Sequence, residues 1–342
     1  MNLLKNQPSA AVSAADAHYD LGLWLQREYA AGRRGSMKAQ LLPQLRRGNV
    51  DLFFAAVFLE SFADEADALR QAEGQIAAIR AEVELASEDF ALCTDSAEIT
   101  AAREAGKIAI VLSTEGAEPF GSDVTLLDRL YAQGVRVLGI AHTRKNLACT
   151  GAPYTAVPGS GEEGLTDFGK ALLRHGQELG MLLDLSHLND AGTADALALS
   201  TRPVIATHSN CRAVCPTPRS LPDELIRGIA ERGGVIGLGC CSPLVGDTRE
   251  SISMETLLRH LEHLLRVAGE DHVCLGLDLA EMICEGEPFT VNGHTTPLVD
   301  VIKGHGALPE FWELLRQQGW PEELLHKIGF SNLMRITGEV LG

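Results

Sequence analysis

Residues 181–208 read MLLDLSHLNDAGTADALALSTRPVIATH. An apolar run at Met181–Asp184 is followed by a helix-type segment and then by a second apolar run at Val204–Thr207, which is the order of a parallel strand-helix-strand unit. A histidine follows each run, His187 the first and His208 the second. Because neighbouring parallel strands end at the same edge, this stretch predicts that the two imidazoles point at one spot.

The same alternation continues along the whole chain. Eight apolar runs of strand type are separated by segments of helix type, and eight parallel strands favour a closed barrel over an open sheet. We therefore expect an α/β protein with a single (β/α)8, TIM-like barrel and an active site at the C-terminal ends of the strands. The runs are Asp16–Leu21, Leu52–Leu59, Ile108–Ser113, Val135–Ala141, Met181–Asp184, Val204–Thr207, Val235–Gly239 and Val273–Gly276.

A single domain over residues 1–342 is expected, since no linker interrupts this pattern. Roughly the first 14 residues are expected to form a flexible arm, because they precede the first run. Two helix-type stretches, Glu310–Gln318 and Pro321–Val340, fall within residues 309–342 and are expected to close the barrel. The one stretch rich in glycine and proline, Gly151–Gly164, follows the fourth run and is expected to be a long loop.

Composition and charge exclude several classes of protein. Of the 342 residues, 45% are hydrophobic and 22% charged, which is typical of a globular chain. The 29 Lys and Arg against 46 Asp and Glu give a net charge of −17, which repels nucleic acids and anionic lipids. Apolar runs such as Leu52–Leu59 are far shorter than the roughly 18 to 20 residues that span a bilayer. With no apolar stretch of signal-peptide type near the N-terminus, we expect a cytoplasmic protein with neither membrane nor nucleic acid as a partner.

Eight cysteines in a chain of this length are too sparse for a disulfide scaffold. Their closest groupings, Cys211 with Cys215 and Cys240 with Cys241, lack the partner pairs of a zinc ribbon. Free and mostly buried thiols are therefore expected.

Other potential metal ligands also follow apolar runs. In His18-Tyr19-Asp20 the first and third side chains share one face of a strand, because strand side chains alternate. Glu115 closes the third run, where a carboxylate can bridge two metal ions. Taken alone, each residue is better explained as a surface, loop or capping residue. Together with His187 and His208, however, all of them fall at strand ends, which favours a metal site.

Asp278 follows the last run, where an acid beside a metal-activated water can shuttle a proton. A helix N-cap is the competing interpretation of Asp278. His142 follows the fourth run, but its spacing alone does not single it out. His260 and His263, three residues apart on an expected helix, are interpreted as part of a solvated face. Gly-Ser-Gly at 159–161 lacks the strand-to-helix context of a nucleophile elbow, so covalent catalysis is disfavoured.

These motifs resemble those of the membrane dipeptidase (renal dipeptidase) family of zinc peptidases, peptidase family M19, in the amidohydrolase superfamily. The resemblance covers nearly the whole chain and keeps the order of the family's motifs. The matching stretches are DAHYDL at 16–21, STEG at 113–116, GMLLDLSH at 180–187, RPVIATHS at 202–209, RSLPD at 219–223 and GFSNLMRI at 329–336.

The resemblance implies a centre with two Zn²⁺ ions, or other divalent metals, in which Glu115 bridges the two. His18 and Asp20 would bind one ion, and His187 and His208 the other. Such a centre polarises the scissile carbonyl and generates a bridging hydroxide that attacks it. The implied reaction is hydrolysis of a dipeptide with a free C-terminal carboxylate, L-D dipeptides included, and the family also implies a homodimer.

Three further residues receive roles from the resemblance. His142 would contact the scissile carbonyl and its tetrahedral successor, and thus take part in both binding and catalysis. Arg219 would grip the substrate's C-terminal carboxylate through two parallel hydrogen bonds. Asp278 would handle the proton.

Two stretches depart from the family pattern. Where the family has D-F-D-G, this chain reads Asp278-Leu279-Ala280-Glu281, which keeps only the first acid. The stretch Gly237–Cys241 replaces a polar, aromatic sequence. Two alternatives therefore stay open beside the dipeptidase: an amidohydrolase acting on another small amide or lactam, and a metal-binding barrel without turnover. A metal analysis combined with a dipeptide screen would separate them.

Overall fold

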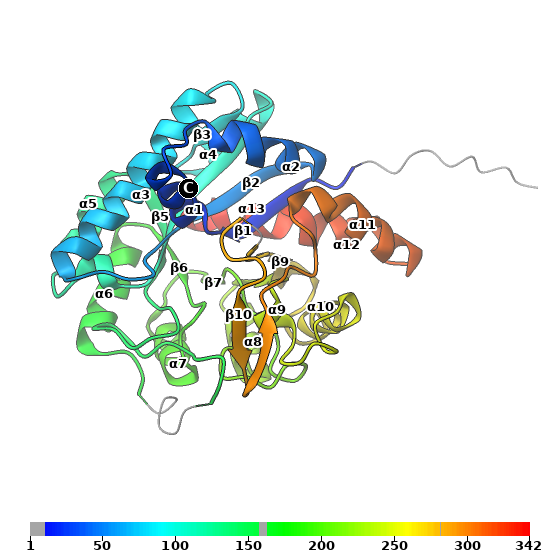
Figure 1. Ribbon diagram of the computed structural model, residues 1–342. Helices are drawn as coiled ribbons and strands as arrows, with labels where there is room; N and C mark the ends of the chain where they lie inside the picture. Colours follow the sequence, from blue (N-terminus) through cyan, green and yellow to red (C-terminus); the bar gives the residue numbers. More distant parts are fainter. Residues whose placement is uncertain (1–10, 157–162, 281) are drawn as a thin grey trace, which may run out of the picture.

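Parallel strands close into a barrel in the computed structural model, which describes residues 11–156, 163–280 and 282–342 (Figure 1). The barrel strands are β1 (Ala14–Tyr19), β2 (Val50–Phe58), β4 (Ile108–Glu115), β5 (Val135–Gly139), β6 (Leu182–Asp184), β7 (Ile205–Ala206), β8 (Val235–Leu238) and β9 (Val273–Leu275). They pair in the order β2-β1-β9-β8-β7-β6-β5-β4, and pairing of β2 with β4 closes the ring. Each strand overlaps one predicted run, so the predicted TIM-like barrel is confirmed.

Three strands in the described part of the chain were not predicted. β3 (Phe90–Leu92) pairs with the first half of β4, whereas β5 pairs with its second half, so β3 lies beside the ring without entering it. β10 (Pro288–Val291) and β11 (His294–Pro297) form an antiparallel hairpin. Its turn is Asn292-Gly293, with φ of 48° and 82°, and Asn-Gly is the usual sequence of a two-residue type I′ turn.

Helices cover the outside of the ring (Figure 1). The helices of the described residues are α1 (Leu21–Ala30), α2 (Leu42–Arg47), α3 (Glu65–Leu85), α4 (Ser96–Glu104), α5 (Leu126–Ala132), α6 (Asp167–Glu178), α7 (Asp190–Leu199), α8 (Asp223–Glu231), α9 (Ser242–Val245), α10 (Met254–Ala268), α11 (Leu308–Gln317), α12 (Glu322–His326) and α13 (Asn332–Leu341). Short 3-10 or π turns are η1 (Met37–Leu41), η2 (Glu118–Phe120), η3 (Glu270–His272), η4 (His305–Ala307) and η5 (Lys327–Ser331). Side-chain caps at Thr166 and Asn189 begin α6 and α7, the helices that flank β6.

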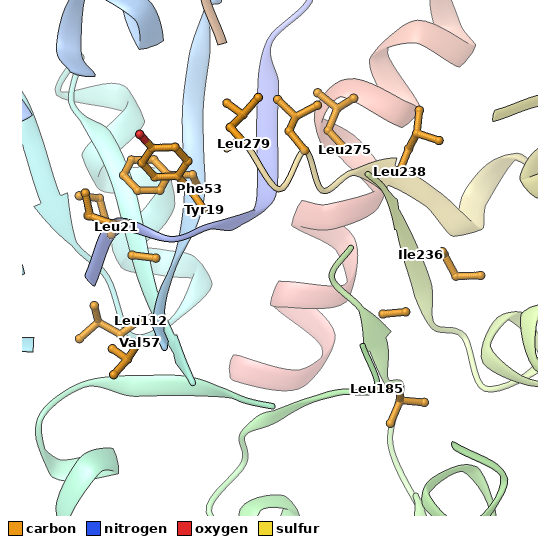
Figure 2. Packing of buried hydrophobic residues seen from close by; sticks show 14 of the residues in the cluster. Tyr19, Leu21, Phe53, Val57, Leu112, Leu185, Ile236, Leu238, Leu275 and Leu279 are labelled. Atoms are coloured by element: carbon orange, nitrogen blue, oxygen red, sulfur yellow. The ribbon is translucent and has the colours of Figure 1, made fainter. Parts of the chain in front are cut away.

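The core has two layers because strand side chains alternate. Leu52 and Phe54 of β2 point into the barrel, whereas Phe53 between them joins the layer under the helices. Figure 2 shows part of this outer layer, with Tyr19, Leu21 and Phe53 grouped together. Eight strands thus supply a packed interior that holds their C-terminal ends in fixed positions.

The C-terminal helix α13 packs against the interior layer through Leu333, Ile336 and Val340. The barrel residues that it meets, such as Ala15 and Leu52, lie in the first halves of their strands, so α13 covers the N-terminal end of the ring. Of the expected N-terminal arm, residues 1–10 lie outside the described residues. Val12, by contrast, is buried against the outer layer.

The two histidines assigned to a solvated helix face are in fact buried, so that interpretation is wrong. Both lie on α10, where His260 accepts a hydrogen bond from the backbone N–H of Cys211 and contacts the Val245 carbonyl. His263 contacts the Asp223 carboxylate at 2.6 Å. The helix lies against α8 and the loop after β7, and this packing could not be derived from the period of the helix alone.

All eight cysteines are free thiols and seven are buried, as predicted. No helix in the described ranges is both long enough and apolar enough to cross a membrane. The expected loop at Gly151–Gly164 connects β5 to α6, and its residues 157–162 lie outside the described residues, Gly-Ser-Gly at 159–161 included.

Candidate metal centre and active site

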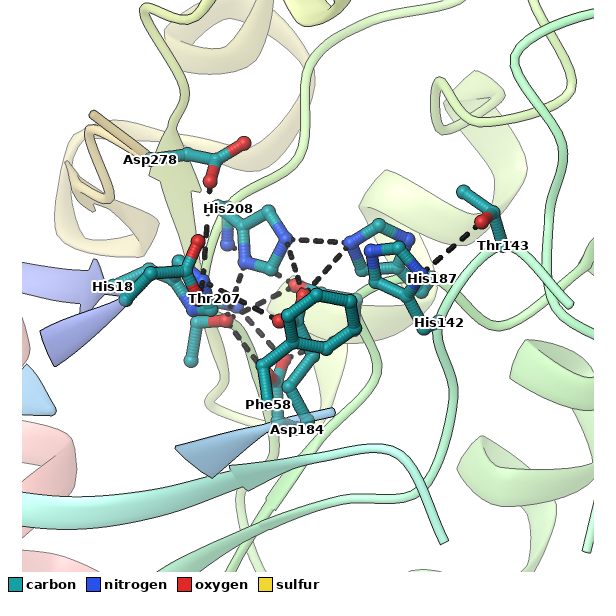
Figure 3. A network of polar contacts seen from close by, with 12 residues as sticks. His18, Phe58, His142, Thr143, Asp184, His187, Thr207, His208 and Asp278 are labelled. Carbon is teal, nitrogen blue, oxygen red and sulfur yellow. Dashed lines mark hydrogen bonds and ion pairs between the residues drawn. The ribbon is translucent and has the colours of Figure 1, made fainter. Parts of the chain in front are cut away.

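All the predicted ligand residues meet at the C-terminal end of the barrel, and Figure 3 shows His18, His187 and His208 among them. His18 lies near the end of β1, and Asp20 follows that strand. Glu115 is the last residue of β4. His187 and His208 follow β6 and β7. Each strand contributes its last residues or those that follow it. The barrel therefore brings together five donor residues, of which the first, His18, and the last, His208, are 190 positions apart in the sequence.

Glu115 lies between two groups of donors. Its Oε1 atom is 3.0 Å from Nε2 of His187 and 3.4 Å from Nε2 of His208. Its Oε2 atom faces the other way and is 3.9 Å from Nε2 of His18, which in turn is 3.6 Å from Oδ1 of Asp20. One carboxylate thus presents one oxygen to each group, as a bridging ligand does.

The spacing of these atoms fits bound cations. Ligand atoms at about 2.0–2.2 Å from one zinc ion lie roughly 3–3.5 Å apart, close to most of the distances above. Nε2 of His18 and Oδ1 of Asp20 are buried and have no hydrogen-bond partner. Nε2 of His187 and Nε2 of His208 approach each other to 2.8 Å, so both aim at the same point. The donor set therefore fits bound divalent metal ions.

The electrostatics of the centre follow from burial. Burial lowers the pKa of His187 and of His208 well below the usual value, so both imidazoles are neutral. Burial also raises the pKa of Glu115. His18 behaves differently: burial opposes its protonation, but the charge of Glu115 and of two aspartates outweighs burial and raises the pKa of His18 to about 10. Two neutral imidazoles, His187 and His208, therefore lie beside a cluster of buried carboxylates, whose negative charge a divalent cation would offset.

A second layer of residues orients His208. Thr207 donates its hydroxyl proton to Asp184 at 2.6 Å, so the same hydroxyl oxygen is left to accept from Nδ1–H of His208 at 2.9 Å. This chain of bonds leaves the lone pair on Nε2 of His208, which is the nitrogen that faces Glu115. Asp184 also accepts from the backbone N–H groups of Ser186 and Thr207, so its position is fixed.

A buried aspartate supports the opposite side of the centre. Oδ1 of Asp16 accepts from the backbone N–H groups of His18 and Leu277, and Oδ2 of Asp16 contacts Nε2 of His305 at 2.8 Å. Asp16 therefore ties the end of β1 to the residue before Asp278. Sequence reasoning gave His305 no role, because its partner lies 289 positions away and no motif links the two.

Two site residues adopt left-handed backbone conformations, His187 with φ of 65° and Asp278 with φ of 53°. Such strained positions are uncommon outside glycine and cluster at functional sites. The turn directs the carboxyl group of Asp278 toward His18, with 3.9 Å between Oδ1 and Nε2. Burial raises the pKa of Asp278 to about 6.

His142 lies beside the centre. Its ring stacks between Phe58 and His187, with centroid distances of 4.3 and 4.5 Å. Burial lowers the pKa of His142 to about 3, so its imidazole is neutral. Gly151 packs directly on the His142 carbonyl, where a Cβ atom would lie 1.6 Å from the oxygen. Only glycine fits there, which fixes the loop that carries His142.

Arg219 is buried next to the centre rather than in the open cavity. Its Nη2 donates to the His208 carbonyl at 2.7 Å and its Nη1 to the Ser209 hydroxyl at 3.1 Å. Its Nε atom is buried without a hydrogen-bond partner. The guanidinium thus supports the His208 backbone, and its Nε–H remains available as a hydrogen-bond donor.

A cavity of about 650 Å³ opens over these residues. Asp20, Glu115, His142, His187 and Asp278 line its floor. The two stretches that depart from the family pattern also reach it, through Cys241 in one and Leu279 and Ala280 in the other. These departures therefore alter the wall of the cavity and leave the ligand set intact.

Comparison with known proteins assigns the chain to a family. The model of the membrane dipeptidase family, peptidase family M19, matches residues 9–341. The chain belongs to the membrane dipeptidase family. This confirms the resemblance found in the sequence and the expectation of a metallohydrolase.

Relatives in this family include curated and solved proteins. An uncharacterized protein in the pqqA 5′ region of Klebsiella pneumoniae is 33% identical over 73% of this chain and 88% of its own length. Dipeptidase tcpJ of Claviceps purpurea is 28% identical over 87% of this chain and 68% of its own length. A metallopeptidase of Rhodobacter sphaeroides, solved with a phosphinate mimic of the dipeptide L-Ala-D-Ala, is 27% identical with a TM-score of 0.84 over 96% of this chain and 99% of that one.

Proposed function

We propose that this protein is a dipeptidase with a binuclear metal centre, zinc in the first instance, that hydrolyses dipeptides with a free C-terminal carboxylate, L-D dipeptides included. The observation that carries the proposal is the placement of Glu115, whose two oxygens face separate donor groups. His18 and Asp20 would hold one ion, and His187 and His208 the other. The dipeptide mimic bound to the Rhodobacter sphaeroides relative supports a dipeptide as substrate.

Divalent ions held by these residues would supply Lewis acidity to the scissile carbonyl and would lower the pKa of a bound water. The remaining work falls to this chain's side chains. Hydrolysis adds the water oxygen to the carbonyl carbon, breaks the C–N bond and moves one proton to the leaving amine. Asp278 lines the cavity beside His18, so its carboxylate would take the proton from the water and return it to the amine nitrogen.

His142 and Arg219 would position the substrate. The neutral imidazole of His142 can donate a hydrogen bond to the carbonyl oxygen and stabilise the charge that develops there. Arg219 keeps an unpartnered buried Nε–H, which supports a role in holding the substrate's carboxylate. Because Arg219 also donates to the His208 carbonyl, binding of the carboxylate by Arg219 would be coupled to the position of His208 at the metal centre.

A screen of the metal-loaded protein against L-L and L-D dipeptides tests the proposal. We expect hydrolysis of several dipeptides, loss of activity after chelation, and recovery when Zn²⁺ is restored. Blocking the C-terminal carboxylate as an amide should weaken hydrolysis strongly. Undiminished cleavage of the amides, or activity on a lactam but on no dipeptide, would favour the alternative of another small amide as substrate. A metal-loaded protein that cleaves nothing in the screen would contradict the proposal.

A further inference from the structure

Five side chains form an apolar patch on one wall of the catalytic cavity, here called the outer subsite. Cys241, Ala280 and Leu298 are buried against one another, and Cys284 and Phe289 pack on them. All five line the same cavity as Glu115 and Asp278. The residues come from the loop after β8, the loop after β9 and the β10–β11 hairpin, so the outer subsite exists only in the folded chain.

Backbone hydrogen bonds hold the outer subsite in place. Cys241 forms an isolated antiparallel bridge with Asp300, whose carboxylate accepts from the backbone N–H of Ala280 at 2.9 Å. The carbonyl of Ala280 accepts from the N–H of Cys284 at 2.9 Å, and the N–H of Leu298 donates to Glu287 at 2.8 Å. This wall is therefore a fixed surface of the cavity.

The β10–β11 hairpin is tied across the cavity to the loop after β5. At the hairpin tip the backbone N–H of Asn292 donates to the Thr155 hydroxyl at 2.9 Å, and its side-chain amide donates to the Asp247 carboxylate at 3.2 Å. Below the tip, the rings of Phe289 and Tyr154 meet edge to face with centroids 4.9 Å apart. Both rings line the cavity, so the hairpin and the loop limit the space beyond the centre.

The outer subsite contains no ionised side chain. Burial raises the pKa of Cys284 to about 12 and that of Cys241 well above the usual value, so both thiols stay protonated and behave as small apolar groups. The acidic groups of the cavity lie on its floor or at exposed positions such as Glu287. An apolar group placed against these five residues leaves water without burying a polar group of the protein, whereas a polar group meets no hydroxyl, amide or charged group among their side chains.

We propose that the outer subsite selects substrates in which one of the two residues carries a bulky apolar side chain. The inference rests on the proposed dipeptidase function and adds a substrate class to it. A pocket of this kind discriminates by roughly 10–200-fold for each methylene that it buries. Leucine and asparagine side chains have similar shapes, so a comparison of the two isolates the effect of polarity.

The test measures kcat/KM of the metal-loaded enzyme for Leu-Gly, Asn-Gly, Gly-Leu, Gly-Asn and Gly-Gly, with D-residue forms of the second position. At one of the two positions the leucine dipeptide should exceed its asparagine counterpart by about tenfold or more. Ratios near one at both positions, in an enzyme that does cleave these dipeptides, would overturn the inference and leave the dipeptidase function standing. If no dipeptide is cleaved, both fall.

Two variants test whether the selectivity arises from the outer subsite. Ala280→Asp adds a charge to the outer subsite, and Leu298→Ala removes apolar surface without adding charge. Each should lower the leucine-to-asparagine ratio by about threefold or more, mainly by lowering the kcat/KM of the leucine dipeptide. Ala101→Asp, on the exposed face of α4, is the matched control and should change neither value. Unchanged ratios in a folded variant of either kind would refute the assignment.

Discussion

Asp278→Asn is the variant that best separates proton transfer from metal binding. The φ of Asp278 is 53°, a left-handed conformation that asparagine adopts as readily as aspartate, so the change adds no backbone strain. Alanine at this position would add strain of roughly 1–2 kcal/mol and confuse the result. Oδ1 of Asp278 is 3.9 Å from Nε2 of His18, too far for a hydrogen bond, so the change breaks no direct bond to His18.

The expected loss comes from the missing proton acceptor. General acid–base catalysis contributes roughly 10²–10⁴-fold to a rate, which corresponds to about 2.7–5.4 kcal/mol in the barrier. We therefore expect kcat to fall by about a hundredfold or more, KM to change by less than about threefold, and the metal content to stay that of the wild type.

Steady-state kinetics and elemental analysis of the same preparation provide the assay. Glu287→Gln is the matched control, because it also removes a carboxylate from the cavity lining but at an exposed position away from His18. Its kcat should stay within about threefold of the wild type. A kcat for Asp278→Asn within that same range, with both metals bound, would refute the proton-transfer role.

Three further predictions concern binding, metal affinity and stability. Arg219→Ala should mainly raise KM. Amidation of the substrate's C-terminus should lower the kcat/KM of the wild type strongly but that of this variant little, and an equal loss of kcat/KM in both proteins would show that Arg219 does not bind the carboxylate. His305→Ala should weaken metal affinity by about 10–100-fold in a metal titration, because Asp16 loses its buried partner; an unchanged affinity would exclude a supporting role. Burial lowers the pKa of His260 to about 4, below its value of about 6.5 in the unfolded chain, so its stabilising contribution is complete above pH 6.5 and is lost as the pH falls toward 4. Between about pH 7.5 and about pH 4.5 the wild type should therefore lose about 2–3 kcal/mol of unfolding free energy that His260→Gln does not lose. Urea titrations measure both proteins, and an equal loss in the two would show that His260 does not cause this pH dependence.

The sequence predicts the barrel and the clustering of the candidate ligand residues because both depend on local order. Most of the candidate residues lie at or just after the end of a strand-type run, so a chain that closes eight runs into a ring brings His18, Glu115, His187 and His208 together. The hairpin was missed although Val291-Asn292-Gly293-His294 carries the Asn-Gly signal of a tight turn. The residues on either side of this turn are largely exposed and do not alternate clearly between apolar and polar, so the sequence pattern predicts no strand there.

Contacts between distant residues could not be read from the sequence. The bond between Asp16 and His305 and the burial of His260 depend on how loops and helices pack around the finished ring. Arg219 shows the same limit: the motif indicates a residue of the site, but the bonds of its guanidinium to the His208 carbonyl and the Ser209 hydroxyl are a property of the fold. The outer subsite likewise joins three segments that no single motif connects.

The metal content of wild type and Glu115→Gln, measured by elemental analysis after identical loading, tests the central claim most directly. The bridging geometry predicts two divalent ions per chain in the wild type, because each oxygen of Glu115 faces its own donor group. The variant keeps the shape of the side chain but loses the charge shared by both ions, so it should lose metal together with activity. A wild type that holds one ion or none, or a variant that keeps both ions, would contradict the account.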